Sequence, residues 1–473
     1  MAIPPIPIEC VIQQRLTEDW VIGLGDHDLS ALVQQRLEAI APSTAQTLVL
    51  LAEPDPLQTL AAILAAGMAQ CSIALGNPLW TVDEWQQAIA LVQPSHVWAD
   101  VDLPLPALWN RDALKQNDGD RPWPASLQNE PLILIPTGGS SGRVKFAMHT
   151  WDTLAASVWG FRQHFGCDRV HACCVLPLYH VSGFMQLLRS LLTGGSLALH
   201  SAKALTAGEL PAIDPAHYFL SLVPTQLQRL LQQPALVGWL PQVRTILLGG
   251  APPWPALLDE ARQHHLNLAL TYGMTETASQ IVTQHPHEFF AGLASCGTPL
   301  PHARLSIRDA AGNPLPQHRV GTVHVQATSL MLGYFPQPFA HPWFATDDVG
   351  YVDHAGRLHV VGRSSDKIIT GGENVFAGEV EAAIRATHLV LDVVVLGMRD
   401  RHWGEVVTAC YVPMHPTVTV PELAEAVGDR LSRYKCPKHW ILLDAIPRNA
   451  QGKVNRAVLQ SMAATAYQNL EKT

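Results

Sequence analysis

The sequence lacks any Cys-x-x-Cys spacing. Its eight cysteines are scattered over 473 residues, and Cys173 and Cys174 lie in an apolar strand-like run, where buried thiols are common. This distribution argues against a disulfide framework and against a zinc site. Charge is also sparse, because 15% of the residues are charged, and the net charge is −9. An acidic balance argues against a nucleic-acid partner, although a nucleotide would need only a local cradle.

A charged leader and a long apolar run are also missing. Three prolines lie within the first seven residues, so we expect no signal peptide. The most apolar window, residues 57–75, contains Gln58 and Gln70, and no uninterrupted span reaches membrane length. With reduced thiols and no membrane span, the sequence predicts a cytoplasmic location.

The length of the chain predicts two or more domains. Up to residue 290, helix-like and strand-like runs alternate, which predicts an α/β fold with parallel sheets. The first runs predict helices at 29–40, 56–69 and 82–91 and strands at 47–51, 72–75 and 96–99. Residues 291–363 hold short alternating runs, typical of a small antiparallel, β-barrel-like unit. We therefore expect a large domain over 1–363 and an α+β C-terminal domain over 364–473.

A glycine- and hydroxyl-rich segment follows the apolar run 132–135. It reads Pro136-Thr137-Gly138-Gly139-Ser140-Ser141-Gly142-Arg143-Val144-Lys145, and a helix-like run begins after Thr150. Glycines let backbone N–H groups approach an anion, the hydroxyls add donors, and Lys145 adds a positive charge. The Walker pattern differs, because here Lys145 lies three residues beyond the last glycine. The segment predicts a phosphate cradle between a strand and a helix, and a flexible surface loop is the alternative.

Three later strand-like runs end in polar or glycine-rich motifs. These motifs are Tyr179-His180-Val181-Ser182-Gly183, Gly249-Gly250-Ala251-Pro252 and Thr271-Tyr272-Gly273-Met274-Thr275-Glu276. Ligands bind beyond the carboxyl ends of parallel strands, so we expect these motifs to converge with the cradle. Glu276 could hold a cation or begin a helix, and His180 could line a pocket or pack in the core.

In this order, the motifs resemble the adenylate-forming superfamily of acyl-CoA synthetases, firefly luciferase and peptide-synthetase adenylation domains. Later segments complete the resemblance, namely Thr346-Asp347-Asp348, Gly362-Arg363, Gly371-Gly372-Glu373-Asn374 and Pro447 to Lys453. The resemblance extends from about residue 130 to about residue 455. Within the superfamily, the chain is most similar to the o-succinylbenzoate–CoA ligase family of the short cyanobacterial type, through Ile135–Gly142 and Phe146–Trp151.

The resemblance implies an ATP-dependent ligase of menaquinone or phylloquinone synthesis. A carboxylic acid, o-succinylbenzoate, would attack the α-phosphate of ATP to give an acyl-adenylate and pyrophosphate. Coenzyme A would then take the acyl group and release AMP, with Mg²⁺ as the metal. The alternatives are another aryl- or acyl-CoA ligase, a stand-alone adenylation domain that loads a carrier protein, and an inactive nucleotide-binding module. The joint presence of Lys145, Glu276, Asp348 and Lys453 disfavours the last of these.

The resemblance also implies a role for each matched residue. The β- and γ-phosphates would be held by Thr137, Gly138, Gly139, Ser140, Ser141, Gly142 and Lys145, the α-phosphate by Thr275, and Mg²⁺ by Glu276. Adenine would be enclosed by Gly249, Gly250, Ala251 and Tyr272, the ribose would be held by Asp348 and Arg363, and Gly273 would belong to the same nucleotide site. Lys453 would stabilise the charge that develops during adenylation, His180 would line the acyl pocket, and Gly371 and Gly372 would form the pantetheine tunnel.

Two positions depart from the superfamily. Asp347 stands where glycine is usual, and the spacing to Gly350 favours Asp348 for the ribose. The C-terminal domain would rotate between the two half-reactions about a hinge that is usually Asp or Lys. Here the hinge position is Ser365, with Asp366 next, and either could be the pivot. The residues that bind a second carboxylate of the acid are unassigned, and the oligomeric state is open.

Overall fold

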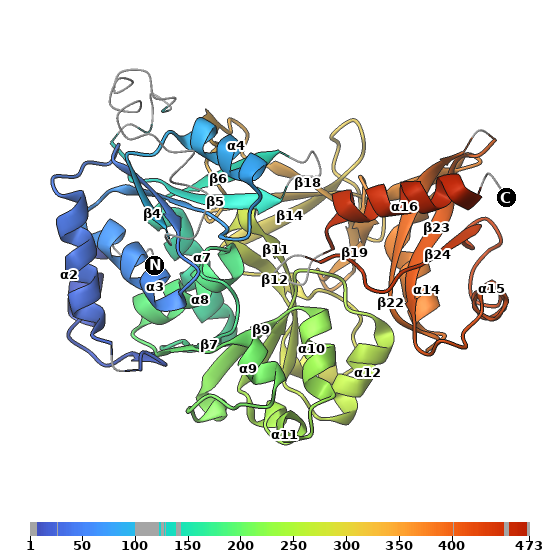
Figure 1. Cartoon of the computed structure of the whole chain (residues 1–473), viewed down its shortest axis with the longest axis horizontal. Helices are drawn as coiled ribbons and strands as arrows, with labels where there is room; N and C mark the ends of the chain where they lie inside the picture. The colour runs from blue at the N-terminus through green and yellow to red at the C-terminus, as the bar shows by residue number, and fades with distance from the viewer. Residues whose placement is uncertain are drawn as a thin grey trace.

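The computed structural model describes residues 7–25, 27–99, 123, 127, 129–138, 143–400, 402–448 and 454–470. Within these residues the chain forms four sheets with helices around them. Figure 1 shows two large sheets on one side and a separate C-terminal unit on the other. The α/β fold with a separate C-terminal domain agrees with the sequence prediction.

The first large sheet carries the start of the predicted phosphate cradle. In spatial order its strands are β17 (Gln337–Pro338), β16 (Gly333–Tyr334), β6 (Val144–His149), β5 (Ile133–Gly138), β3 (Ser72–Leu75), β2 (Leu48–Ala52) and β4 (His96–Ala99). The pairs among β2, β3, β4 and β5 are parallel, as the alternating runs predicted. Every residue of β2 is buried, in accord with its continuous apolar sequence.

The second large sheet carries the other predicted motifs. Its strands in order are β1 (Val21–Ile22), β8 (Leu197–Leu199), β7 (His171–Cys174), β9 (Tyr218–Leu222), β10 (Thr245–Leu248), β11 (Leu268–Met274), β12 (Ser279–Thr283) and β13 (Thr298–Pro299). It is parallel from β1 to β11 and antiparallel from β11 to β13. The strand that follows Glu276, β12, turns back and pairs antiparallel with β11.

Helices separate the two large sheets and cover their outer faces. The N-terminal and central helices are α1 (Ile8–Arg15), α2 (Leu29–Ile40), α3 (Pro56–Met68), α4 (Val82–Val92), α7 (Trp151–Phe165), α8 (Val181–Thr193), α9 (Ala202–Thr206), α10 (Pro224–Leu231), α11 (Pro234–Val237), α12 (Pro255–Gln263) and α13 (Pro286–Phe290). The central core joins α3 and α8 to both sheets, because residues 59–67 and 183–191 are buried throughout. Helix α4 packs on the outer face of the first sheet.

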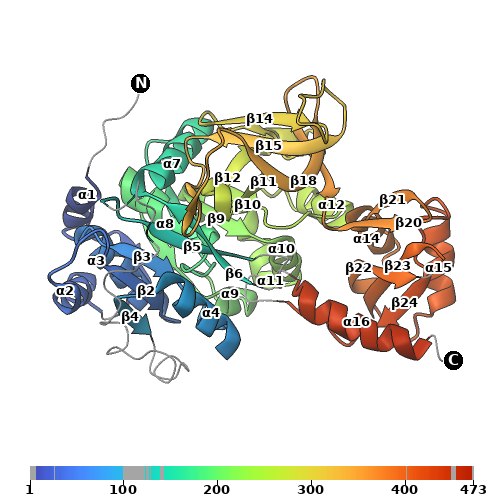
Figure 2. The same ribbon diagram turned by 90° about the horizontal axis from the view of Figure 1, so that it is seen from above.

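Two smaller sheets complete the fold (Figure 2). One is antiparallel, with β14 (Ala303–Arg308), β15 (Gly321–Ala327), β18 (Phe344–Val352) and β19 (Leu358–Arg363). The other contains β20 (Lys367–Thr370), β21 (Glu373–Phe376), β22 (Val390–Asp400), β23 (Gly404–Pro413) and β24 (His439–Leu442), with helices α14 (Ala377–Arg385), α15 (Val420–Gly428) and α16 (Arg456–Leu470). The short runs after residue 290 predicted the first of these sheets.

The sequence missed one strand and misplaced the end of another. The helix predicted after Thr150 is α7, which begins at Trp151, but the sequence did not show that β6 lies before this helix and pairs antiparallel with β5. The sequence also predicted that a strand ends before Thr271, whereas β11 continues to Met274 because β12 pairs with its polar half. Among the described residues, no helix is long and apolar enough to cross a membrane.

Candidate active site

The phosphate-cradle sequence forms a β-hairpin. Strands β5 and β6 place Thr137 opposite Lys145, and Gly138 opposite Val144. The position of Lys145, three residues beyond the last glycine, follows from this geometry, because the lysine lies on the returning strand. The connecting residues 139–142, which include four of the predicted phosphate ligands, lie outside the described residues.

Glu276 lies next to this hairpin. It belongs to a short 3₁₀ turn, η4 (Thr275–Thr277), that directly follows β11, and its side chain is buried. Thr137 Oγ1 donates to Glu276 Oε1 over 3.1 Å, and the Tyr334 hydroxyl donates to the same oxygen over 2.7 Å. Lys145 Nζ lies 5.5 Å from the ring centroid of Tyr334. Four elements, β5, β6, η4 and β16, therefore bring a hydroxyl, a cation, a carboxylate and a phenol together.

Tyr334 and His149 hold the Glu276 carboxylate and its turn in place. Burial and the Glu276 carboxylate raise the pKa of Tyr334, so the phenol keeps its proton and remains a donor. His149 is fully buried at the end of β6, and its Nε2 donates to the Thr275 carbonyl over 2.9 Å. Burial lowers the pKa of His149 to about 4, so the imidazole is neutral. It ties the turn that carries Thr275 and Glu276 to β6.

A second group surrounds Asp348. The Tyr272 hydroxyl donates to Asp348 Oδ2 over 2.8 Å, and Arg363 Nε donates to Oδ1 over 3.3 Å. Asp348 and Arg363 are opposite each other in the pair of β18 with β19, and Asp348 is only 6% exposed. Burial, together with the Asp348 carboxylate, raises the pKa of Tyr272. Since Tyr272 and Glu276 are four residues apart, the segment from β11 to η4 links the two groups.

The glycine motif after β10 lies against the same segment. A Cβ atom on Gly249 would be 2.2 Å from Thr271 Oγ1, so this close approach to β11 requires glycine. Gly250 has a φ of +80°, and Ala251 follows it. A Cβ atom on Gly273 would be 2.0 Å from the Ser279 carbonyl oxygen of β12. The glycine motif therefore begins against Thr271, the residue before Tyr272.

The remaining predicted residues lie elsewhere. His180 precedes α8, and its ring centroid lies 4.7 Å from that of Tyr179. Gly371 and Gly372 form the turn between β20 and β21, where the Gly371 N–H donates to the Trp403 carbonyl over 2.9 Å. Lys453 lies outside the described residues.

The side chains present fit a magnesium ion that is bound mainly by phosphate. Across the described parts of the chain, no three His, Cys, Asp or Glu side chains gather to hold a metal. Both donors that the described residues offer to Glu276 reach Oε1. One protein carboxylate with phosphate oxygens and water is the ligand set that Mg²⁺ prefers.

Sequence reasoning missed three residues near these groups. Tyr334 lies 58 residues after Glu276 in sequence, so no spacing signalled their contact. His149 is the last residue of β6, a strand that was not predicted. Arg189 did leave a signal, since it is the one charged residue in the apolar stretch 181–193.

Arg189 is a buried cation with no acidic partner among the described residues. It is 2% exposed, its Nη2 donates to Ser279 Oγ over 3.3 Å, and its guanidinium lies 4.2 Å from the ring centroid of Phe161. Its Nε has no hydrogen-bond partner within the described residues. Burial lowers the pKa of Arg189 to about 9. An uncompensated charge of this kind is costly in a folded chain.

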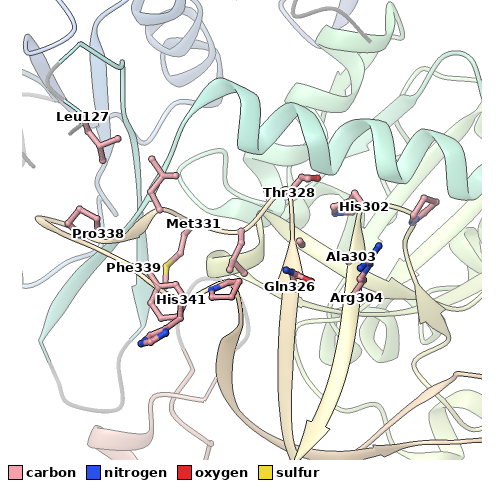
Figure 3. A pocket seen from close by; sticks show the side chains of 15 residues that line it. Leu127, His302, Ala303, Arg304, Gln326, Thr328, Met331, Pro338, Phe339 and His341 are labelled. Atoms are coloured by element: carbon pink, nitrogen blue, oxygen red, sulfur yellow. The ribbon is translucent and has the colours of Figure 1, made fainter. Parts of the chain in front are cut away.

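A cavity of about 720 Å³ lies beside the Glu276 group (Figure 3). Its walls include Ala303 and Arg304 of β14 and Gln326 of β15, and Met331 lies on another side. The N–H of Met331, one of the lining residues, donates to the Glu276 carbonyl over 2.8 Å, so the cavity lies next to the backbone of Glu276. None of its lining residues is a predicted site residue.

Two family models match the chain. The AMP-binding enzyme model matches residues 43–335, and the AMP-binding enzyme C-terminal domain model matches residues 379–453. The first match covers more than half of the chain, and the two follow each other in the expected order. The chain therefore belongs to the AMP-binding enzyme family.

The chain is also similar in sequence to particular relatives. The chain is 34% identical to the 2-succinylbenzoate–CoA ligase of Bacillus velezensis over 342 residues, which are 71% of this chain and 69% of that protein. It is also similar to solved structures of one Bacillus subtilis protein, the o-succinylbenzoate CoA synthetase MenE, at 26% identity and 96% coverage of this chain.

Three complexes of that Bacillus subtilis protein score differently. The TM-score is 0.81 for the complex with the acyl-adenylate intermediate OSB-AMP, which is covered to 98%. It is 0.79 for the complex with ATP and magnesium ion, covered to 99%. For a double mutant bound with the product analogue OSB-NCoA, also covered to 98%, the TM-score is 0.65.

Proposed function

We propose that this chain is an ATP-dependent ligase that adenylates o-succinylbenzoate and transfers the acyl group to coenzyme A, in menaquinone or phylloquinone synthesis. The observation that carries the adenylation chemistry is the contact between Thr137 of the cradle hairpin and the buried Glu276 carboxylate. The names of the Bacillus relatives support the choice of acid.

The two groups around Glu276 and Asp348 would bind the two ends of the nucleotide. Thr137, Lys145 and the intervening loop would hold the β- and γ-phosphates, with Thr275 near the α-phosphate and Glu276 on Mg²⁺. When bound, Mg²⁺ neutralises phosphate charge that would otherwise repel the attacking carboxylate. Asp348 would accept hydrogen bonds from the ribose hydroxyls. The ring of Tyr272 and the motif Gly249-Gly250-Ala251 would enclose adenine.

In the first half-reaction, a carboxylate oxygen of the acid forms a bond to the α-phosphorus, and the bond to the pyrophosphate breaks. Lys453 would stabilise the charge that develops at this junction. In the second, the sulfur of coenzyme A forms a bond to the acyl carbon and AMP leaves with the bonding electrons. We place the C-terminal domain at residues 364–473 and propose that it rotates between these steps, with Gly371 and Gly372 beside the pantetheine arm.

Arg189 is our candidate for binding the second carboxylate of the acid. A dicarboxylate would supply the acidic partner that this buried guanidinium lacks among the described residues. Arg189 also reaches Ser279, four residues after Thr275, so it lies near the predicted position of the α-phosphate. His180 precedes the helix that carries Arg189 and would line the same pocket.

The Arg189 assignment predicts a loss of selectivity. We expect Arg189→Ala to raise the KM for o-succinylbenzoate about tenfold or more, because one charge-assisted hydrogen bond is lost. The KM for ATP should stay within about twofold. The analogue that lacks the ring carboxylate, 4-oxo-4-phenylbutanoate, should be used equally by both proteins. A KM for o-succinylbenzoate that does not change would reject the assignment.

A panel of acids tests the proposed function. Pyrophosphate release should depend on o-succinylbenzoate, ATP and Mg²⁺, and the product should be the coenzyme A thioester. Turnover of another acid with none of o-succinylbenzoate would favour the aryl- or acyl-CoA ligase alternative. Transfer only to a carrier-protein thiol, and not to free coenzyme A, would favour a stand-alone adenylation domain.

A further inference from the structure

The segment that joins the last antiparallel strand to the C-terminal unit is held by Asp347. Both carboxylate oxygens of Asp347 accept hydrogen bonds from Ser365, Oδ1 from the backbone N–H over 3.1 Å and Oδ2 from the side-chain hydroxyl. The Asp347 carbonyl also accepts the N–H of Ser364 over 2.7 Å. Asp347 lies on β18, so these bonds fasten Ser365 to the large domain.

The side chain of the next residue, Asp366, contacts the C-terminal unit. Asp366 Oδ2 lies 2.7 Å from Arg456 Nη2, at the first residue of α16 in the C-terminal unit. The strand β20 of that unit begins one residue later, at Lys367. The Asp366 N–H still donates to the Arg363 carbonyl of β19 over 3.2 Å, so only the side chain of Asp366 is bound to the C-terminal unit. The side chains of these two adjacent residues are therefore bound to different parts of the molecule.

We propose that the Asp347 carboxylate is a clamp that holds Ser365, at the expected hinge, on the large domain and so favours the arrangement for adenylation. The proposal rests on the proposed function, in which the domain rotates between two half-reactions. The clamp explains two departures from the superfamily together, since glycine at position 347 could not accept hydrogen bonds from a serine at position 365.

Comparison with two complexes supports the proposal that the clamp favours the arrangement for adenylation. The chain matches the OSB-AMP complex of the Bacillus subtilis protein with a TM-score of 0.81, and the product-analogue complex of the same protein with 0.65, at equal coverage. Over its whole length, the chain in which Ser365 donates to Asp347 is therefore more similar to the complex with an adenylate than to the complex with the product analogue.

Amide hydrogen exchange tests the clamp without any substrate. In Asp347→Ala, exchange in the segment 364–370 should rise about threefold to tenfold, because an exposed hydrogen bond contributes modestly. Ser365→Ala should have a smaller effect, since its N–H still donates to Asp347. Asp309→Ala removes a turn carboxylate that accepts hydrogen bonds only within its own turn among the described residues, and should leave this segment unchanged. Equal exchange in Asp347→Ala and the wild type would overturn the proposal.

Single-turnover rates test the bias itself. We expect Asp347→Ala to raise the ratio of acyl transfer to adenylation about threefold or more, because the arrangement for adenylation loses its clamp. A ratio equal to that of the wild type would show that the clamp does not govern the rotation. If no acid is adenylated by the wild type, the proposed function fails, whereas hydrogen exchange still decides whether Asp347 holds Ser365.

Discussion

Single side chains decide where charge can be held at this site. The Glu276 carboxylate is buried, yet it has a hydroxyl and a phenol as donors, which compensates part of the cost of burial. Both donors reach one oxygen, and this orients the carboxylate. Tyr334 is therefore a positioning residue for the proposed magnesium ligand.

Removing the Tyr334 hydroxyl should weaken magnesium binding. We expect Tyr334→Phe to raise the Mg²⁺ concentration for half-maximal activity about tenfold, because a hydrogen bond to a charged group is lost. The matched control is Tyr351→Phe, on β18, where the ring stacks on His359 at a centroid distance of 4.7 Å. The measurement is activity against Mg²⁺ at saturating ATP. If the two variants have the same Mg²⁺ dependence, Tyr334 does not position Glu276.

His149 should make stability depend on pH. Its pKa is lowered to about 4 by burial, whereas an unfolded histidine has a pKa of about 6.5. The unfolded chain thus takes up the proton first, and the stabilisation present above pH 6.5 is lost as the pH falls toward 4. His149→Gln keeps a donor for the Thr275 carbonyl but does not titrate.

Urea unfolding at pH 7 and pH 5 measures this effect. Between these values the wild type should lose about 2 kcal/mol more than His149→Gln in its free energy of unfolding. Burial also lowers the pKa values of His164 and His302 to about 4, but both histidines are present in both proteins, so their contribution cancels. Equal losses in the two proteins would mean that His149 is not held neutral by the fold.

The element that organises the site is the antiparallel return from β11 to β12. It carries Tyr272 and Glu276 on one segment, and the two backbones approach so closely at Gly273 that a side chain cannot enter. Strand propensity predicted the apolar part of β11. The polar part could not be predicted, because its partner strand becomes evident only once the chain has turned back at Ala278, which has a φ of +52°.

Gly273→Ala should disrupt this return. The added Cβ would lie 2.0 Å from a backbone oxygen, so the strands must separate, and we expect a loss of about 1–3 kcal/mol in the free energy of unfolding. ATP binding should weaken as well. Gly378→Ala is the control, because Gly378 lies in α14 with open space around it and alanine suits a helix. A variant as stable as the control would show that the approach at Gly273 is not required.

The sequence also left the hairpin of β5 and β6 unpredicted. Residues 144–149 follow a glycine-rich loop and precede a helix, so nothing local showed that they pair with β5. The expected convergence of the motif segments is seen in two side-chain contacts, Thr137 with Glu276 and Tyr272 with Asp348. The roles of these residues toward substrates stay predictions.

Across the whole molecule, we propose that Lys453 acts in adenylation and not in acyl transfer. We expect Lys453→Ala to slow adenylation about 10²–10³-fold, because one group that stabilises the developing charge is removed. Acyl transfer from a supplied acyl-adenylate should stay within about threefold of the wild-type rate. Lys203→Ala, at an exposed position in α9, is the control. Equal slowing of both half-reactions would assign Lys453 a structural role instead.

The α/β fold and its separate C-terminal domain could be predicted from alternating runs, because periodicity is local information. Contacts between domains could not. Asp347 and Ser365 are 18 residues apart, and only the folded chain brings these two unusual residues together. A contact within the large domain was equally unpredictable. Arg189 and Ser279 are 90 residues apart and lie on α8 and β12.

The exchange of labelled pyrophosphate into ATP measures whether the chain adenylates o-succinylbenzoate. Without coenzyme A, adenylation is reversible, so label should enter ATP when o-succinylbenzoate and Mg²⁺ are both present. We expect rapid exchange that depends on this acid and falls about 10²-fold or more in Glu276→Gln. Exchange without o-succinylbenzoate, or no exchange when it is supplied, would mean that this acid is not adenylated at the proposed site.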